Sequence, residues 1–146
     1  MQELIRIAPV LGVYGGGKRG FGIPVTTRYA SVMTNNALDW QDEERGGAHV
    51  LGPKGRVDES TADMFKNHLI SAVEKKPSTL VIDLDGVAYM SSRGLRALTL
   101  AQRASQGSDT NIVLARPNET MREILAISRY DMVFRVADTV EDAIAN

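Results

Sequence analysis

Two adjacent hydroxyl side chains, Ser91 and Ser92, are the residues of this sequence best placed to do chemistry. They follow the apolar run 79–84, which predicts a strand buried on both faces that ends in a short turn. The residues after them, up to about Gln106, have the apolar spacing of a helix. The first N–H groups of a helix have no partner within it, and that end carries about half a positive charge. A serine here is either an ordinary helix cap or a site suited to carry phosphate.

Two arginines next to these serines favour the phosphate interpretation. Arg93 and Arg96 lie one and four residues after Ser92, where each cation opposes the helix dipole by about 0.3–1 kcal/mol. A phosphate on Ser92 would add about two negative charges and reverse that sign. Gly94 has no side chain, so we expect a phosphate or a partner's backbone to come close to this turn. Taken alone, solvated arginines beside a capping serine would be the ordinary alternative.

The side chains that most enzymes need are sparse. His49 and His68 are the only histidines, and there is no cysteine, which excludes a thiolate metal site. There is no Gly-x-Ser-x-Gly nucleophile elbow, and Gly15-Gly16-Gly17-Lys18 matches only the end of a phosphate-binding loop. The sequence therefore predicts a protein that is not an enzyme and that uses neither a metal nor another cofactor.

Composition sets the class of protein. The chain has 146 residues, of which 43% are hydrophobic, enough for one domain with a real core. A net charge of −1 gives no general attraction to nucleic acid. No apolar run reaches the roughly 18 residues of a membrane span. The lack of cysteine suits a reducing cytosol, so we expect a cytoplasmic protein.

The first part of the chain differs from the rest. Residues 1–36 are rich in glycine and show no helical or strand period. We expect a disordered leader, or a start codon assigned too early with translation beginning at Met33; a docking arm is the functional alternative. Residues 37–146 are expected to form a single domain.

Strands and helices alternate in that domain. A hairpin is predicted around Gly46-Gly47, and Asp58 is expected to cap a helix that Pro77 closes. Further elements are a strand at 111–115, a helix opened by Pro117-Asn118-Glu119, a strand at 133–136 and a terminal helix capped by Asp138 or Thr139. The apolar face of the first helix comprises Ala62, Phe65, Leu69, Ala72 and Val73. The pattern predicts an α/β domain with a mostly parallel or mixed central sheet of about five strands and about four helices.

The stretch from 89 to 96, Tyr-Met-Ser-Ser-Arg-Gly-Leu-Arg, resembles the STAS domains of bacterial anti-sigma factor antagonists. The resemblance extends over about residues 38–146 and includes Gly55-Arg56-Val57-Asp58 and the segment 139–143. In that family the motif often contains Asp-Ser-Ser-Gly-Leu, and the serine after the aspartate is phosphorylated. Ser92 occupies the phosphorylated position. Ser91 replaces the aspartate and is the second candidate acceptor.

The resemblance implies a mechanism and a set of partners. The unmodified domain binds an anti-sigma factor that is also a serine kinase, and this releases a sigma factor. The kinase phosphorylates the serine and breaks the complex, and a PP2C-type phosphatase restores it. The partner-binding surface is expected to comprise Asp58, Ser91, Arg93, Gly94, Leu95 and Arg96, with the turns at Asp58 and Ser92 close together at one edge of the sheet.

Two other functions remain as alternatives. One is a STAS subunit of a membrane transport complex. The other is a receiver-like domain that accepts phosphate on an aspartate. A receiver would need an acidic pair after its first strand, whereas this sequence has one acidic cluster, Asp83 and Asp85. The helix after Ser92 is apolar over more than one stripe, which fits either a contact surface or a helix packed between two neighbours.

Overall fold

The computed structural model describes residues 38–145, which belong to the second of two units into which the chain divides after Ala37. The expectations for residues 1–36, a disordered leader or a start at Met33, lie outside the described residues. The domain boundaries proposed from the sequence therefore remain predictions.

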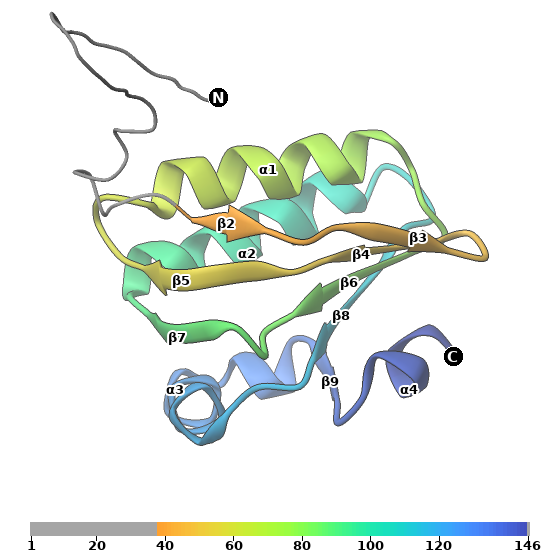
Figure 1. Ribbon diagram of the computed structural model, residues 1–146. Helices are drawn as coiled ribbons and strands as arrows, with labels where there is room; N and C mark the ends of the chain where they lie inside the picture. The colour runs from red at the N-terminus through yellow and green to blue at the C-terminus, as the bar shows by residue number, and fades with distance from the viewer. Residues whose placement is uncertain (1–37, 146) are drawn as a thin grey trace, which may run out of the picture. The chain divides into compact units, whose positions relative to one another are not determined.

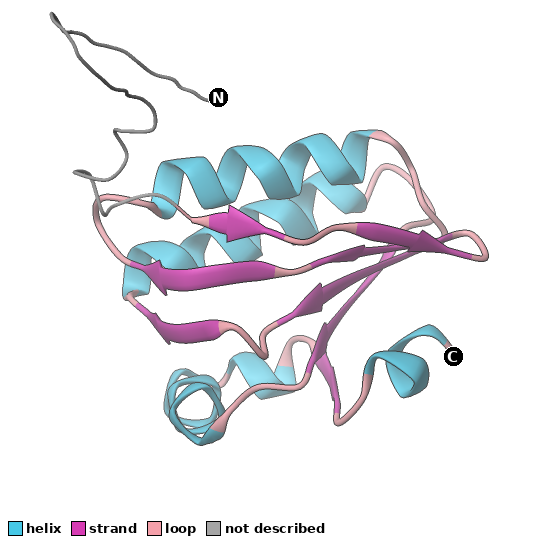
Figure 2. Ribbon diagram, in the orientation of Figure 1, coloured by secondary structure: helices cyan, strands magenta, loops and turns pink. Residues whose placement is uncertain are grey.

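The strands form two sheets (Figure 2). The strands are β2 (Asp39–Trp40), β3 (Glu43–Arg45), β4 (Ala48–Leu51), β5 (Pro53–Val57), β6 (Thr79–Asp83), β7 (Val87–Met90), β8 (Asn111–Ala115) and β9 (Arg135–Ala137). In the five-stranded sheet, with order β3-β4-β6-β8-β9, only β3 and β4 pair antiparallel. In the three-stranded sheet, with order β2-β5-β7, β5 and β7 pair parallel. The predicted mostly parallel, mixed arrangement is confirmed.

Within residues 38–145, four α-helices cover these strands, as expected. They are α1 (Ala62–Glu74), α2 (Ser92–Ser105), α3 (Glu119–Ser128) and α4 (Val140–Ile144). In Figure 1, α1 and α2 run side by side along one face of the strands, with α1 at the top and α2 partly behind β2, and α3 and α4 lie below the strands. The five residues predicted for the apolar face of α1 are all buried. The hairpin between β3 and β4 is also confirmed, with Gly46 and Gly47 at φ 53° and 88°, which glycine adopts without steric cost.

The strand β6 is buried on both faces, as its apolar run predicted. Leu80 and Ile82 belong to the large core cluster that also contains the buried residues of α1 and α2. Val81 belongs to a second cluster, which it forms with Val140 and Ala143 of α4. Burying one such aliphatic side chain stabilises the fold by about 1.5–3 kcal/mol. This strand therefore anchors the loop that leads to Ser91 and Ser92.

The short turn predicted between this strand and α2 is wrong, because residues 87–90 form the strand β7. Val87 and Met90 are buried, whereas Ala88 is exposed. Four residues with no strict alternation carry little signal for a strand. Pairing with β5, whose own sequence includes Lys54, Gly55 and Arg56, stabilises it instead. Neither of these two strands could be predicted from its own residues.

The last strand begins at Arg135 and not at Val133. Tyr130–Met132 form a short 3-10 helix, and the N–H of Phe134 donates a hydrogen bond to the carbonyl of Tyr130 at 2.9 Å. The turn leaves Val133 exposed and places Phe134 in the core. Val133 and Phe134, the apolar residues that suggested a strand, therefore belong to a turn.

The prediction that Asp58 caps α1 is also wrong. The helix begins four residues later, and its N-cap residue, Thr61, makes no side-chain capping bond. The Asp58 carboxylate instead accepts hydrogen bonds from the backbone N–H and the hydroxyl of Ser60, at 3.0 and 2.7 Å. The Asp58 carbonyl accepts the N–H of Ala62 at 2.9 Å. Asp58 thus organises the turn that precedes the helix.

Candidate functional site

The parallel pairing of β5 and β7 brings the turns at Asp58 and Ser92 together. Val57 is opposite Met90 in the register, and the N–H of Ser91 donates to the carbonyl of Val57 at 2.8 Å. The carboxyl ends of parallel strands lie at the same edge of a sheet. The sequence-based expectation that these two turns are neighbours is therefore confirmed.

The two serines have different roles. Ser91 is the N-cap of α2, and its hydroxyl accepts a hydrogen bond from the Gly94 N–H at 3.4 Å. Ser91 is only 9% exposed. Its backbone carbonyl accepts the N–H of Leu95 at 3.0 Å. Ser92 is the first residue of the helix and is exposed. Between the two, Ser92 is the hydroxyl that an external protein can reach.

Gly94 does not open the surface, which corrects the expectation drawn from its missing side chain. It is buried and faces inward. A Cβ at this position would lie 2.5 Å from Cγ of Met90 and 2.6 Å from Cγ1 of Val57. The glycine therefore lets the first turn of α2 pack directly on β5 and β7. Leu95 is likewise a core residue, 8% exposed.

Arg93 is neutralised by acids that the sequence analysis did not connect with it. Its guanidinium lies 3.5 Å from the carboxylate of Glu59 and 3.5 Å from that of Asp63. All three side chains are largely exposed, so each pair contributes at most about 1 kcal/mol. The available signal was the acidic start of α1, a common location for carboxylates. Nothing local indicated that the start of α2 would lie beside it.

Arg96, by contrast, lines a small groove between α1 and α2. The groove has a volume of about 110 Å³ and is bounded by Ala62, Asp63, Lys66, Arg93, Arg96, Ala97 and Leu100. Within residues 38–145, no ion pair involves Arg96 or Lys66. The α2 helix also packs along α1, which accounts for several of its apolar positions.

Asp58 is held as an anion at this edge. Hydrogen bonds from Ser60, first from its hydroxyl and then from its N–H, lower the pKa of Asp58 below its ordinary value, with a further contribution from Arg56. The Arg56 guanidinium lies over the ring of Tyr89, 4.6 Å from its centroid. The edge therefore presents Arg56, Asp58, Ser92 and Arg93 around the start of α2.

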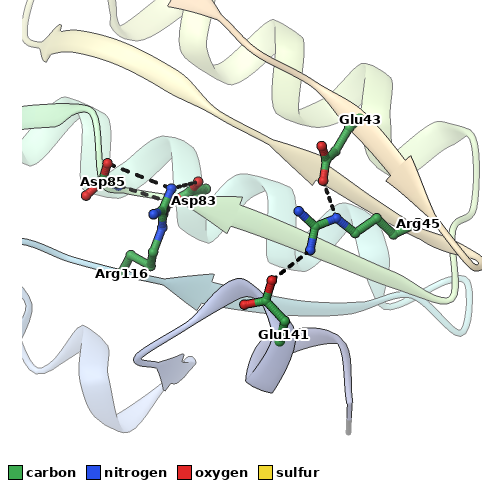
Figure 3. Close-up of polar contacts among 6 residues, drawn as sticks. All are labelled: Glu43, Arg45, Asp83, Asp85, Arg116 and Glu141. Carbon is green, nitrogen blue, oxygen red and sulfur yellow. Dashed lines mark hydrogen bonds and ion pairs between the residues drawn. The ribbon is translucent and has the colours of Figure 1, made fainter.

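A second polar cluster lies at the carboxyl end of β6 (Figure 3). Arg116 donates to both carboxylate oxygens of Asp83, at 3.0 and 2.7 Å, and lies 3.8 Å from Asp85. The hydrogen bond to Asp83 raises the pKa of Arg116. Nearby, Arg45 joins Glu43 to Glu141, at 3.2 Å from the latter. Asp83, which could have suggested a receiver site, is thus engaged in a bidentate ion pair.

The two histidines are accounted for by packing. His68 of α1 stacks on Trp40, with ring centroids 3.7 Å apart, and its Nε2 lies 2.7 Å from the Asp42 carboxylate. His49 is buried within β4. Among residues 38–145, no three acidic or histidine side chains are grouped so that they could hold a metal ion. No helix within residues 38–145 has the length and apolar character needed to cross a membrane.

A family comparison agrees with this geometry. The model of the STAS domain family matches residues 39–143. This chain belongs to the STAS domain family. The matched residues include both turns of the site, at Asp58 and at Ser92.

Several proteins similar to this STAS domain are named as anti-sigma factor antagonists. It is 32% identical to the anti-sigma-F factor antagonist RsfB of Mycobacterium tuberculosis over 101 residues, which are 69% of this chain and 82% of RsfB. A solved anti-sigma factor antagonist from Mycobacterium paratuberculosis has a TM-score of 0.67 at 23% identity, covering 77% of this chain and 95% of that one.

The anti-sigma factor antagonist SpoIIAA has the same fold and has been solved in two states. Its unphosphorylated form has a TM-score of 0.62 at 18% identity, covering 73% of this STAS domain's chain and 93% of its own. The phosphorylated form from Bacillus has a TM-score of 0.56 at 19% identity, with 73% and 97% covered.

Proposed function

We propose that this STAS domain is a phosphorylation-switched antagonist of an anti-sigma factor. In its unmodified form it binds an anti-sigma factor that is also a serine kinase, and a sigma factor is thereby released. The kinase phosphorylates Ser92, which dissociates the complex, and a PP2C-type phosphatase removes the phosphate. The domain itself binds and does not catalyse, and it acts in the cytoplasm.

The observation that carries the proposal is that Ser91 and Ser92 differ in exposure and in structural role. Ser91 caps the helix and is buried, whereas Ser92 is exposed at the first position of α2. A negative charge at a helix N-terminus is favourable, so the folded domain tolerates a phosphate there. Phosphorylation can then change the surface without changing the fold.

The surrounding residues support a contact surface at this edge. Arg93 and Arg96 are exposed beside Ser92, and Asp58 lies on the adjacent turn. Gly94, Leu95 and Ser91 support these residues from beneath, so they contribute to binding by positioning the exposed side chains. A phosphate in the middle of such a contact would have to lose its hydration against the partner, and this weakens the complex.

The relatives support the choice of partner. RsfB is named as the antagonist of an anti-sigma-F factor, and SpoIIAA has been solved both with and without phosphate. An anti-sigma factor is accordingly the class of protein we expect this chain to bind.

The test measures binding of purified anti-sigma factors of the host, one at a time, by calorimetry. We expect one of them to bind the unmodified chain and the Ser92→Ala variant equally well. Ser92→Asp should bind at least about tenfold more weakly, because a desolvated charge at a contact costs more than about 1.4 kcal/mol. Incubation with ATP and a kinase-active anti-sigma factor should place phosphate on Ser92, as mapped by mass spectrometry.

Ser71→Asp is the matched control, because Ser71 is an exposed serine on α1. It adds the same charge elsewhere and should leave binding unchanged. Phosphate on neither Ser91 nor Ser92, or full binding by the phosphorylated chain, would show that no switch operates at this site. Phosphate on Ser91 alone would mean that Ser91, and not Ser92, is the phosphate acceptor.

A further inference from the structure

The groove between α1 and α2 carries more positive than negative charge. Of its charged lining residues, Asp63 is matched with Arg93, which also pairs with Glu59. Lys66 and Arg96 make no ion pair with another residue of the described part of the chain. Beneath these charges the groove is lined by Ala62, Ala97 and Leu100, of which the two alanines are buried. The groove therefore combines a small apolar floor with two cations that no acidic side chain of residues 38–145 pairs with.

Arg96 is also the cation that a phosphate on Ser92 would reach. The two residues are four positions apart on α2, so they lie on the same face of the helix. An acidic group four residues before a basic one is the favourable order in a helix. Arg93, although adjacent, is already engaged by two carboxylates of the neighbouring segment. A dianionic phosphate on Ser92 would thus pair mainly with Arg96.

We propose that this groove binds an acidic segment of the partner protein, and that a phosphate on Ser92 competes with the segment for Arg96. The inference rests on the proposed function, since it specifies how the partner is held and how it is released. Charge complementarity selects an acidic occupant, and the small floor accommodates one apolar side chain beside the carboxylate. Phosphorylation both occupies Arg96 and adds negative charge next to Arg93, another lining residue of the groove, so two effects act in the same direction.

The first experiment uses the anti-sigma factor that binds the unmodified chain. All variants carry Ser92→Ala, so phosphorylation plays no part. Adding Arg96→Glu should weaken binding at least about tenfold, and Lys66→Glu should weaken it as well. Arg103→Glu is the control, because Arg103 is an exposed arginine in the last turn of the same helix, and its effect should stay within about twofold.

Thermal unfolding of each variant shows whether the fold is kept, and Arg96→Gln provides a milder change should the charge reversal destabilise α2. An acidic residue of the anti-sigma factor whose change to lysine restores binding to Arg96→Glu would identify the docked segment. Equal weakening by Arg96→Glu and Arg103→Glu, or none by either, would overturn the proposal.

The second experiment measures the phosphorylated chain by itself, with no partner bound. The phosphate of the full chain phosphorylated at Ser92 is titrated by ³¹P NMR, and pairing with Arg96 should bring its second pKa below the ordinary value of about 6. Arg96→Gln should raise that pKa, and Arg103→Gln should leave it unchanged. If the phosphate has the same second pKa in the original chain, in Arg96→Gln and in Arg103→Gln, the proposal that it competes for Arg96 is overturned.

The two levels of inference fail in different ways. If no anti-sigma factor binds the unmodified chain, the proposed function fails, and the phosphate titration alone decides whether Arg96 pairs with the phosphate. If one binds and Ser92→Asp abolishes binding while Arg96→Glu does not weaken it, the function stands and the groove is not the docking site.

Discussion

Gly94 illustrates how a single position can satisfy a motif and the core at once. It lies in the first turn of α2, where a glycine costs about 1 kcal/mol relative to alanine in helix propensity. A glycine is nevertheless required at this position, because any Cβ would collide with Met90 and Val57. By keeping α2 close to β5 and β7, the glycine sets the position of Ser92 two residues earlier.

Replacement of this glycine should therefore destabilise the protein. Gly94→Ala forces the two strands away from the helix, and we expect the free energy of unfolding to fall by up to about 2 kcal/mol after the gain in helix propensity is subtracted. Chemical denaturation measures the free energy of unfolding. Gly107→Ala is the control, since a Cβ at Gly107 would meet no atom within 4 Å, and its stability should be unchanged or slightly higher. Equal effects of the two changes would contradict this role for Gly94.

Among the secondary-structure elements, the pairing of β5 with β7 is what brings the two turns of the site together. The helix α3 also contacts β7 and stabilises its position. Asn118, the N-cap of α3, accepts the N–H of Met121 through Oδ1 at 2.8 Å. Its Nδ2 donates to the carbonyl of Val87 in β7, also at 2.8 Å. One side chain thus begins a helix and ties it to the strand that leads into Ser91 and Ser92.

Loss of the Asn118 amide should affect both elements. We expect Asn118→Ala to lower the free energy of unfolding by about 1–3 kcal/mol, because a helix cap and a second hydrogen bond are removed together. Hydrogen exchange should show faster opening in residues 87–90 as well as in α3. Asn67→Ala, at an exposed position of α1, should stay within about 0.5 kcal/mol of the original chain. If exchange increased in α3 alone, Asn118 would be a cap and no more.

At the scale of the whole chain, the described residues form two hydrophobic core clusters. The two clusters contain residues from Leu38 to Ala143, on both sides of β6. Residues 1–32, by contrast, are glycine-rich and lack any helical or strand period. The site also lies entirely within the matched region, residues 39–143.

A chain that begins at Met33 should consequently be as stable as the full chain. We expect its thermal midpoint to differ by less than about 4 °C, which corresponds to roughly 1 kcal/mol for a domain of this size. Differential scanning calorimetry of the two chains is the measurement, and anti-sigma factor binding should also be equal. A lower midpoint would mean that the first 32 residues pack on the domain, and a loss of binding alone would make them a docking arm.

The sequence by itself determined the features that depend on neighbours along the chain. The buried strand β6, the start of α2 after Ser91 and the start of α3 at Pro117-Asn118-Glu119 follow from local hydrophobic pattern and helix-start signals. The motif around Ser92 was also visible without any structure. Only the tertiary structure decided that β5 pairs with β7, that Gly94 faces the core, and that Arg93 pairs with Glu59 and Asp63. Arg93 and Asp63, for example, are thirty residues apart in sequence, and strand register, which depends on packing of the complete core, is what brings such residues into contact.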